Sequence, residues 1–336
     1  MQEMLSTEQF EYVNTAAQDS LPVKRMIEPQ KLPLRATYYP LGFPADVATN
    51  SIEILEQFAV LWGAFRKRQD TAPIRCEALL VEEALGECPA AAEYRLMLPF
   101  AMSVADANNY CIADLERGKA TISVSRSALR DPHFVRYFLL GMSTCCITSC
   151  YATPVHSGCV SLNGRGILLC GDSGAGKSTL AYACARAGFT YVNDDSTYIL
   201  DGGTAREVAG NCHQVRLRPA ATALFPELSE CKTTMRAAGK PSIELPTAPM
   251  ANIACAQTAR VDFIVFLNRH SPGPAKLLPF DRKSATEWMH QVPFGPVESL
   301  ARQYASIENL LKTEILELHY SDLDSAIHSL RLLASG

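Results

Sequence analysis

The chain has 336 residues, of which 48% are hydrophobic and 20% are charged. This composition is typical of a folded globular protein and excludes an intrinsically disordered one. The length favours two domains over a single compact core. The net charge is −4 and there is no long run of Lys and Arg, so we expect no nucleic-acid partner.

The sequence pattern predicts neither export nor a membrane span. The first residues, MQEMLSTEQFEYV, lack the basic segment and apolar run of a signal peptide. The apolar stretch 134–150 is too short and too polar to cross a bilayer, and it is predicted to be a buried helix. The twelve cysteines include no C-x-x-C pair and are predicted to be reduced thiols in the core. We therefore expect a cytoplasmic protein without a membrane partner.

The first 150 residues contain short segments of both helical and extended pattern. Residues 1–30 have little periodicity and are predicted to be a loose lead-in. A strand and turn are expected within 35–48, and Asn50, with a glutamate three residues later, is typical of a helix start. Asp131 and Pro132 predict a second helix start, as N-cap and first helical residue. Four further segments are predicted to be strands, the last two as a hairpin: 74–81, 94–97, 110–115 and 121–124.

A strand–loop–helix pattern begins near residue 153, and we place a domain boundary there to within about 20 residues. The prediction is an α+β N-terminal domain of unassigned role over residues 1–150. An α/β domain with a central sheet and flanking helices is predicted over residues 151–336.

A glycine-rich loop stands at the start of this second domain. Residues 166–170 (GILLC) form an apolar run typical of a buried strand, and residues 171–178 (GDSGAGKS) match G-x-x-x-x-G-K-[ST] in full. Glycines in such a loop allow backbone angles that turn successive N–H groups towards an anion. A helix-forming segment, 179–187, follows and ends at Gly188, so the helix N-terminus would face the phosphates. This pattern predicts a nucleotide-binding P-loop, or Walker A motif.

The side chains of the motif have expected roles. Lys177 would neutralise the β- and γ-phosphates of ATP, and the Ser178 hydroxyl would ligate Mg²⁺. The residues predicted to bind nucleotide are Gly171, Asp172, Ser173, Gly174, Ala175, Gly176, Lys177, Ser178 and Thr179, together with Arg216.

Phosphoryl transfer also needs a carboxylate, and two later strands are candidates to supply it. The strand 262–267 is the more hydrophobic, but it ends without an acid. The shorter strand 191–193 leads into Asp194 and Asp195, at the end of a strand where ligands bind in open α/β sheets. Neighbouring residues on a strand face opposite sides, so one aspartate would face the metal and the other the acceptor. The alternative is a solvated turn before Ser196.

The combination of H-S-G at 156–158, a strand, GDSGAGKST, a helix and NDD resembles the catalytic domain of bacterial HPr kinase/phosphorylase and its related proteins. The resemblance is best over 154–200 and continues weakly through 210–219 and 316–333. The first 150 residues do not resemble the N-terminal domain of the bifunctional enzyme, and a match to that of its less characterised relatives stays open. The resemblance implies a P-loop domain of HPr-kinase type that binds ATP and Mg²⁺ and phosphorylates a serine hydroxyl.

The resemblance also implies roles for individual residues. Asp194 becomes the candidate catalytic base, His156 its partner, and Asp195 a neighbour near the metal, beside the catalytic Lys177. From its position alone, His156 is better explained as a structural residue than as a catalytic one.

The chain departs from the family in two places. Where the family has Glu-Ile-Arg-Gly, this chain has Gln214-Val215-Arg216-Leu217. The family's glutamate carboxylate, which helps to hold the metal, is thus replaced by an amide, whose oxygen binds Mg²⁺ more weakly. Gln214 is still counted as a metal ligand, with Ser178 and Asp195. The family's glycine-rich segment for the reverse, dephosphorylating reaction is not found, which favours a monofunctional kinase or a bare nucleotide binder over a kinase/phosphorylase. Arg216 and Arg218 would either neutralise the transferring phosphoryl group or form structural ion pairs.

The last helix is predicted to start at Ser321 as N-cap, with Asp324 in its first turn. It would close the P-loop domain or form a contact within a homo-oligomer. The segment 227–249 has the polar and Gly/Pro content of a mobile cover over the site.

Three functions are consistent with these features. The first is a kinase that transfers the γ-phosphoryl group of ATP to a hydroxyl of a protein, a peptide or a small molecule. The second is a nucleotide-binding regulatory protein with little or no kinase activity, which Gln214 favours. The third is a transporter-type ATPase, which ranks last because the chain has no LSGGQ-like signature. The sequence does not identify the acceptor.

Overall fold

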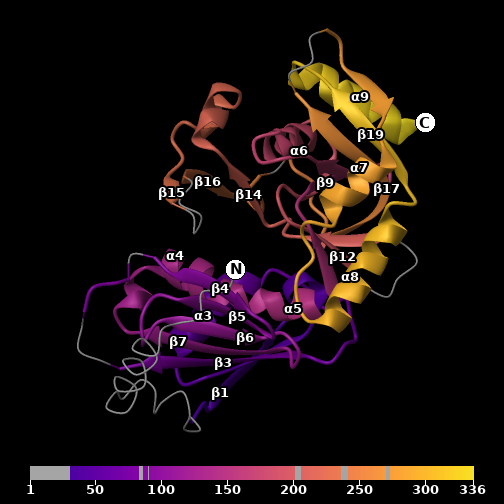
Figure 1. Cartoon of the computed structure of the whole chain (residues 1–336). Helices are drawn as coiled ribbons and strands as arrows, with labels where there is room; N and C mark the ends of the chain where they lie inside the picture. Colours follow the sequence, from indigo (N-terminus) through magenta and orange to yellow (C-terminus); the bar gives the residue numbers. More distant parts are fainter. Residues whose placement is uncertain are drawn as a thin grey trace, which may run out of the picture.

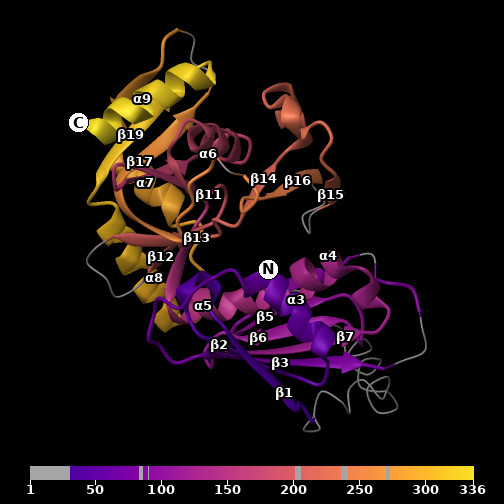
Figure 2. The ribbon, with the colours of Figure 1, turned by 180° about the vertical axis from the view of Figure 1, so that it is seen from behind.

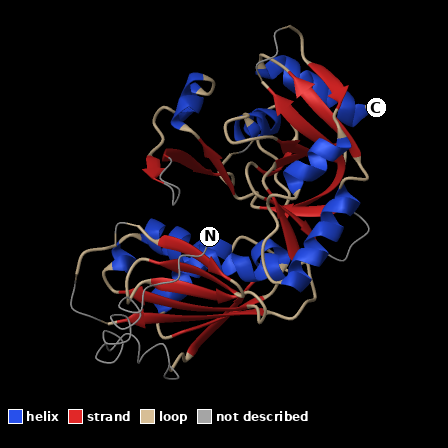
Figure 3. Ribbon diagram, in the orientation of Figure 1, coloured by secondary structure: helices blue, strands red, loops and turns tan. Residues whose placement is uncertain are grey.

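The computed structural model describes residues 31–82, 86–89, 91–200, 206–235, 241–250, 252–269 and 273–336. The predicted lead-in, 1–30, lies outside the described residues. The first part of the chain forms one sheet with helices along one face (Figure 1). The second part forms a sheet with helices on both faces, and a smaller sheet stands beside it (Figure 3). The fold is therefore a mixed α/β arrangement.

The first sheet has seven strands in the order β1-β2-β3-β7-β6-β5-β4. The pairs β2–β3 and β3–β7 are parallel, and the others are antiparallel. The strand expected at 74–81 is present, and the expected hairpin is formed by β6 and β7. The strands are β1 (Leu34–Tyr38), β2 (Ala45–Thr49), β3 (Ile74–Val81), β4 (Glu93–Met97), β5 (Phe100–Val104), β6 (Tyr110–Asp114) and β7 (Lys119–Ser125).

Helix α3 (Ile52–Trp62) packs on this sheet, and its N-cap corrects the sequence prediction. The capping residue is Ser51, whose hydroxyl accepts a hydrogen bond from the backbone N–H of Glu53 at 3.1 Å. Asn50 was the expected cap. Its side-chain amide instead bonds both the N–H and the C=O of Leu80, at 2.7 and 2.9 Å, and so ties the helix start to β3.

The segment expected as one buried helix, 134–150, is buried but is not continuous. Asp131 caps α4 (Pro132–Phe134) as predicted, accepting hydrogen bonds from the backbone N–H groups of the second and third residues after it. A wide turn, η3 (Val135–Leu139), and a tight turn, η4 (Leu140–Ser143), then separate α4 from α5 (Thr144–Cys150). The Ser143 hydroxyl donates to the C=O of Leu140, and this local hydrogen bond competes with a regular helix.

The second sheet positions the P-loop. Its main path is β11-β9-β10-β17-β13-β12-β8, and β19 pairs with β17 and β18. Strands β10 and β19 run parallel to β17, while β9 runs antiparallel to both β10 and β11. The carboxyl ends of β10, β11, β17 and β19 therefore meet at one edge, with the amino end of β9. The strands are β8 (Ala152–Val155), β9 (Gly158–Leu162), β10 (Arg165–Cys170), β11 (Thr190–Asn193), β12 (Thr197–Leu200), β13 (Glu207–Gly210), β17 (Thr258–Asn268), β18 (Lys276–Pro279) and β19 (Glu314–His319).

Helices cover both faces of this sheet. Alternate residues of β10 face opposite sides: Ile167 joins the core beneath α6 (Lys177–Arg186) and α9 (Leu323–Ser335), while Leu168 joins the core beneath α7 (Arg282–Met289) and α8 (Val297–Leu310). Figure 1 shows the same layers. Helix α6 begins at Lys177, two residues before the predicted start. Helix α9 is capped by Asp322, which accepts from the N–H of Ser325 at 2.8 Å, and not by Ser321 as expected.

A three-stranded sheet, in the order β14-β16-β15, lies on the side of α6 away from α9 (Figure 2). Its strands are β14 (Gln214–Leu217), β15 (Thr233–Met235) and β16 (Pro241–Pro246), with the turns η5 (Pro219–Ala223) and η6 (Pro226–Leu228) between β14 and β15. The segment 227–249 was expected to be a mobile cover over the site. Its described part contains the end of η6 and the paired strands β15 and β16.

Hydrogen bonds join the two halves of the chain. The Tyr137 hydroxyl donates to Glu244 Oε2 at 3.1 Å, and the Ser149 and Ser299 hydroxyls lie 3.0 Å apart. The cysteines are free thiols, and burial raises the pKa of those in the core, such as Cys170 to about 12. None of the helices in the described ranges has the length and apolar character that a membrane crossing needs.

Candidate functional site

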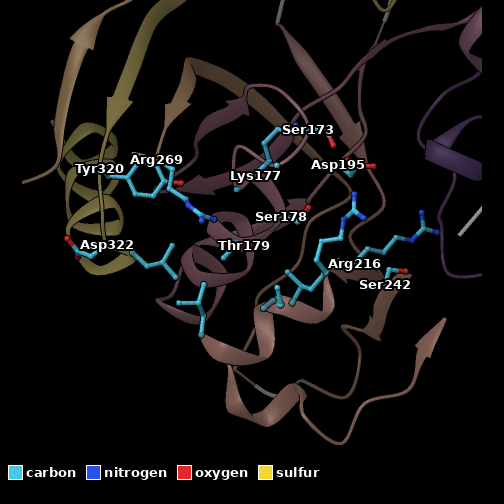
Figure 4. A pocket seen from close by; sticks show the side chains of 18 of the residues that line it. Ser173, Lys177, Ser178, Thr179, Asp195, Arg216, Ser242, Arg269, Tyr320 and Asp322 are labelled. Carbon is cyan, nitrogen blue, oxygen red and sulfur yellow. The ribbon is translucent and has the colours of Figure 1, made fainter. Parts of the chain in front are cut away.

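A cavity of about 810 Å³ lies at the edge where the carboxyl ends of the central strands meet. The P-loop follows β10, and its residues Lys177 and Ser178 line the cavity floor (Figure 4). Asp195 and Arg216 lie on one side of these residues, and Arg269 and Tyr320 on the other (Figure 4). The cavity thus joins the predicted P-loop to residues on or just after four other strands, β11, β14, β17 and β19.

The P-loop backbone has the left-handed angles that only glycine adopts without strain. Gly174 and Gly176 have φ of +94° and +101°. A Cβ at Gly176 would also lie 3.1 Å from the Tyr320 hydroxyl oxygen. The sequence needs glycine at this position for both reasons. Of the predicted nucleotide-binding residues, Ser173, Gly174, Gly176, Lys177, Ser178, Thr179 and Arg216 line the cavity, while Gly171, Asp172 and Ala175 complete the loop behind them.

Lys177 bridges the loop and His156. Its Nζ donates to the C=O of Gly171 at 2.7 Å and of Asp172 at 3.1 Å, and lies 3.1 Å from Nε2 of His156. Burial lowers the pKa of the ammonium group, and the Asp195 carboxylate partly opposes this shift. The ammonium group is held where it can exchange these carbonyls for phosphate oxygens.

His156 lies beside Asp195, whereas the sequence predicted Asp194 as its partner. Its Nδ1 is 3.5 Å from Asp195 Oδ1. The reason is the strand order. His156 directly precedes β9, and β9 lies between β10 and β11 in the sheet. The imidazole ring therefore lies between Lys177, which follows β10, and Asp195, which follows β11. Lys177, His156 and Asp195 form one line of polar groups.

Asp194 has a different environment. Its Oδ1 accepts from the Tyr191 hydroxyl at 2.9 Å, and its Oδ2 is buried without a hydrogen-bond partner among the described residues. Burial, with the neighbouring Asp195 charge, raises the Asp194 pKa to about 6. Asp194 lines only a second cavity of about 280 Å³, whereas Asp195 lines both cavities. Both aspartates therefore line the second cavity, and Asp195 is the one of the two that also lines the P-loop cavity.

Gln214, a predicted metal ligand, does not line the P-loop cavity. Its amide bonds the Tyr137 hydroxyl, Glu244 Oε2 at 3.1 Å and Arg216 Nε at 3.1 Å. The carboxylate of Glu244 lies opposite Arg216 across the β14–β16 pair. Gln214 is thus held among side-chain partners away from the phosphate-binding loop.

Arg216 reaches both cavities. Its guanidinium carbon lies 4.8 Å from the centre of the Tyr137 ring, and its Nε is 3.7 Å from Glu244 Oε1. Arg218 also lines the P-loop cavity. Arg216 therefore has the structural ion pair that the sequence left open, and it also lines the P-loop cavity.

The side chains present fit a magnesium ion held mainly by nucleotide phosphates. The Ser178 hydroxyl and the Asp195 carboxylate line the same cavity and are hard oxygen ligands. Mg²⁺ is commonly bound through one or two protein oxygens with substrate phosphates and water, so Gln214 is not required. Within the described residues, no group of three or more His, Cys, Asp and Glu could hold a metal alone.

Sequence reasoning missed the far wall of the cavity. Arg269 directly follows β17, and Tyr320 directly follows β19. Tyr320 is buried and its hydroxyl has no hydrogen-bond partner among the described residues. One rule could have predicted these two residues from the sequence. The carboxyl ends of parallel strands meet at one edge of the sheet, so the residue that follows each such strand is a candidate for the site. These two strands lead into an arginine and a tyrosine instead of an acid.

No family model matches the chain, and no curated protein matches it either. Among solved structures, it is similar to the Hpr(Ser) kinase/phosphatase from Coxiella burnetii, at 12% sequence identity and a TM-score of 0.29. The match covers 55% of this chain and 99% of that one. A likeness of that extent says nothing about activity.

Proposed function

We propose that this chain is an ATP-dependent kinase that transfers the γ-phosphoryl group to a hydroxyl of a protein, a peptide or a small molecule. One observation supports this most. The imidazole of His156 lies between the ammonium group of Lys177 and the carboxylate of Asp195, so that the three side chains form a row in space. Asp195 alone would serve Mg²⁺ in any protein that binds nucleotide, and the buried Asp194 carboxylate next to it is the additional acid that transfer to a hydroxyl needs.

The P-loop residues supply the binding. Backbone N–H groups of the loop and the Lys177 ammonium would hold the β- and γ-phosphates, with Arg216 and Arg269 on opposite sides of the cavity (Figure 4). Ser178 and Asp195 would hold Mg²⁺, which neutralises charge on the phosphates. Together these groups would fix the γ-phosphorus in place before transfer.

Asp194 is the proposed general base. In the transfer, the acceptor O–H gives its proton to the Asp194 carboxylate, a bond forms between the acceptor oxygen and the γ-phosphorus, and the bond from that phosphorus to the β–γ bridging oxygen breaks. ADP leaves with the electron pair. A base with a pKa near 6 is ionised at neutral pH yet still accepts a proton readily, which suits this task.

The second candidate is a nucleotide-binding regulatory protein. It is favoured by Gln214, which stands where the resembling family has a metal-binding carboxylate and which here bonds Tyr137, Arg216 and Glu244. On this alternative, nucleotide occupancy would act through Arg216 and Tyr137 on the contact between the two halves of the chain.

Transfer of label from γ-labelled ATP distinguishes the two candidates. The protein is incubated with Mg²⁺ and with cell extract split into protein and small-molecule fractions. We expect labelled product with the wild type, a loss of about a hundredfold or more in Asp194→Asn, and ATP affinity in that variant within threefold of wild type. Lys177→Ala should lose both ATP binding and transfer.

Asp70→Asn is the matched control, since Asp70 is exposed and pairs only with Lys67 on the surface of the first half. It should leave transfer unchanged. If no fraction accepts label while ATP binds equally to wild type and Asp194→Asn, the kinase proposal fails and the regulatory alternative stands.

A further inference from the structure

The second cavity, of about 280 Å³, lies where the two halves of the chain meet. One wall comes from the first half and is largely apolar, with Leu61, Trp62 and Phe65 from the end of α3 and the residues after it. The opposite wall comes from the segment after β11 and includes Asp194 and Asp195. None of the P-loop residues 171–179 lines this cavity.

The two cavities share Asp195 and Arg216 in their linings. A group in the second cavity and a phosphate in the first would therefore meet across these two side chains. Arg216, with its guanidinium group held against Tyr137, would place a positive charge at that junction. This is where a transferring phosphoryl group needs charge neutralisation.

A buried carboxylate lies beside the same space. Asp194 lines the second cavity and not the first, and its Oδ2 is buried with no hydrogen-bond partner among the described residues. A buried carboxylate oxygen without a donor is costly and is rare in native proteins. A hydroxyl group in the second cavity is a donor of the kind this atom lacks.

Resting on the kinase function proposed above, we infer that the second cavity is the acceptor subsite and that its ligand is a small, neutral alcohol with an apolar body. The volume is near the lower limit for small-molecule sites, which suits a compact ligand. The apolar wall would bury the body of the alcohol, and the aspartates would receive its hydroxyl. Two carboxylates against one arginine disfavour an anionic acceptor.

In the transfer, the alcohol O–H gives its proton to Asp194, the new bond joins the alcohol oxygen to the γ-phosphorus of ATP, and ADP leaves with the electrons of the broken P–O bond. The products are a phosphate monoester and ADP. The first half of the chain thereby acquires a role, because it forms the apolar wall that selects the acceptor.

The two tryptophans of the chain are separate probes of the two cavities. Trp62 lines the second cavity, while Trp288 Nε1 donates to the P-loop residue Asp172 at 3.1 Å. In Trp288→Phe protein, fluorescence reports the acceptor cavity, and in Trp62→Phe protein it reports the P-loop. The test titrates each variant with 2-phenylethanol, glycerol, lactate, a serine peptide and ATP with Mg²⁺.

We expect 2-phenylethanol to change Trp62 fluorescence saturably, at least tenfold more tightly than glycerol, lactate or the peptide, and to accept label from γ-labelled ATP. Filling the cavity with Ser196→Phe, at an exposed lining residue, should weaken this binding at least tenfold. Thr144→Phe is a second blocking variant from the other wall. Ser229→Phe is the matched control, exposed and in neither lining.

The inference is overturned if no saturable change occurs with 2-phenylethanol, if binding survives both blocking variants, or if only the peptide accepts label. The response of Trp288 to ATP separates this failure from failure of the proposed function. An ATP response without alcohol binding rejects only the acceptor subsite, whereas no ATP response rejects nucleotide binding itself.

Discussion

At the scale of single residues, the contrast between Asp194 and Asp195 is the most informative feature of the site. The two are adjacent in sequence, yet Asp194 is buried against Tyr191 while the Asp195 side chain is 31% exposed beside His156. Alternation along an extended segment predicted that they would face different spaces. It did not predict which of them lies beside His156, because that depends on the position of β9 in the sheet.

The raised pKa of Asp194 has a consequence for stability. The folded-state pKa, about 6, lies above the unfolded value of 3.8, so the folded state binds the proton more tightly. This contribution to stability is fully present below pH 3.8 and is lost as pH rises through 6. At neutral pH, Asp194 is therefore ionised at a cost to the folded state.

The substitution Asp194→Asn removes this titration, while the amide oxygen can still accept the hydrogen bond from the Tyr191 hydroxyl. Between pH 5 and pH 8, the stability of the variant relative to wild type should rise by about 1 kcal/mol. Urea unfolding at the two pH values measures it. A difference that does not change with pH would show that Asp194 has an ordinary pKa.

The activity of wild type should fall as pH drops below 6, because the base becomes protonated. In Asp195→Asn protein, any residual transfer should retain activity to lower pH, since a neighbouring negative charge that raises the Asp194 pKa is gone. If the transfer activity of both proteins falls at the same pH, Asp194 is not the base.

At the scale of elements, the P-loop was predictable because local sequence determines it. The strand 166–170, the glycines and the helix after them follow from short-range rules, and β10 and α6 are present within two residues of the expected bounds. Helix caps were less predictable. Ser51 and Asp322 cap α3 and α9, each one residue after the expected cap, because neighbouring polar residues compete for the same role.

Glycine replacement tests the loop as an element. In Gly176→Ala, the alanine must adopt a φ of +101°, and its Cβ lies 3.1 Å from the Tyr320 hydroxyl oxygen. In Gly164→Ala, in the β9–β10 turn, the alanine must adopt a φ of +78°, but no other atom lies within 4 Å of its Cβ. Each should lose roughly 1 kcal/mol of stability from the left-handed backbone. Only Gly176→Ala should weaken ATP binding, by at least tenfold, measured by calorimetry. Equal ATP affinities in the two variants would refute the loop as the phosphate cradle.

At the scale of the whole molecule, the second half forms the P-loop cavity and the first half contributes one wall of the second cavity. The predicted mixture of α/β elements is observed, but contacts between the halves, such as that of Tyr137 with Glu244, were not predictable. They join residues more than a hundred positions apart, and no local pattern in the sequence marks them. Gln214 was misplaced for the same reason, since its partners lie on β16 and η3.

Arg269 and Tyr320 illustrate what long-range topology adds to the site. Each stands directly after a strand whose place in the sheet is visible only once β17 and β19 are paired with β10. The sequence therefore predicted the half of the cavity that is contiguous in the chain. The wall that comes from distant strands required the structure.

The central claim is that this cavity binds the phosphates of a nucleotide, and calorimetric titration tests it most directly. With Mg²⁺, wild type should bind ATP and ADP at least a hundredfold more tightly than adenosine. Lys177→Ala should weaken ATP binding at least tenfold, as expected for loss of a charged contact of about 1.5–3 kcal/mol. Adenosine binding as tightly as ATP, or an ATP affinity indifferent to Lys177→Ala, would contradict the account.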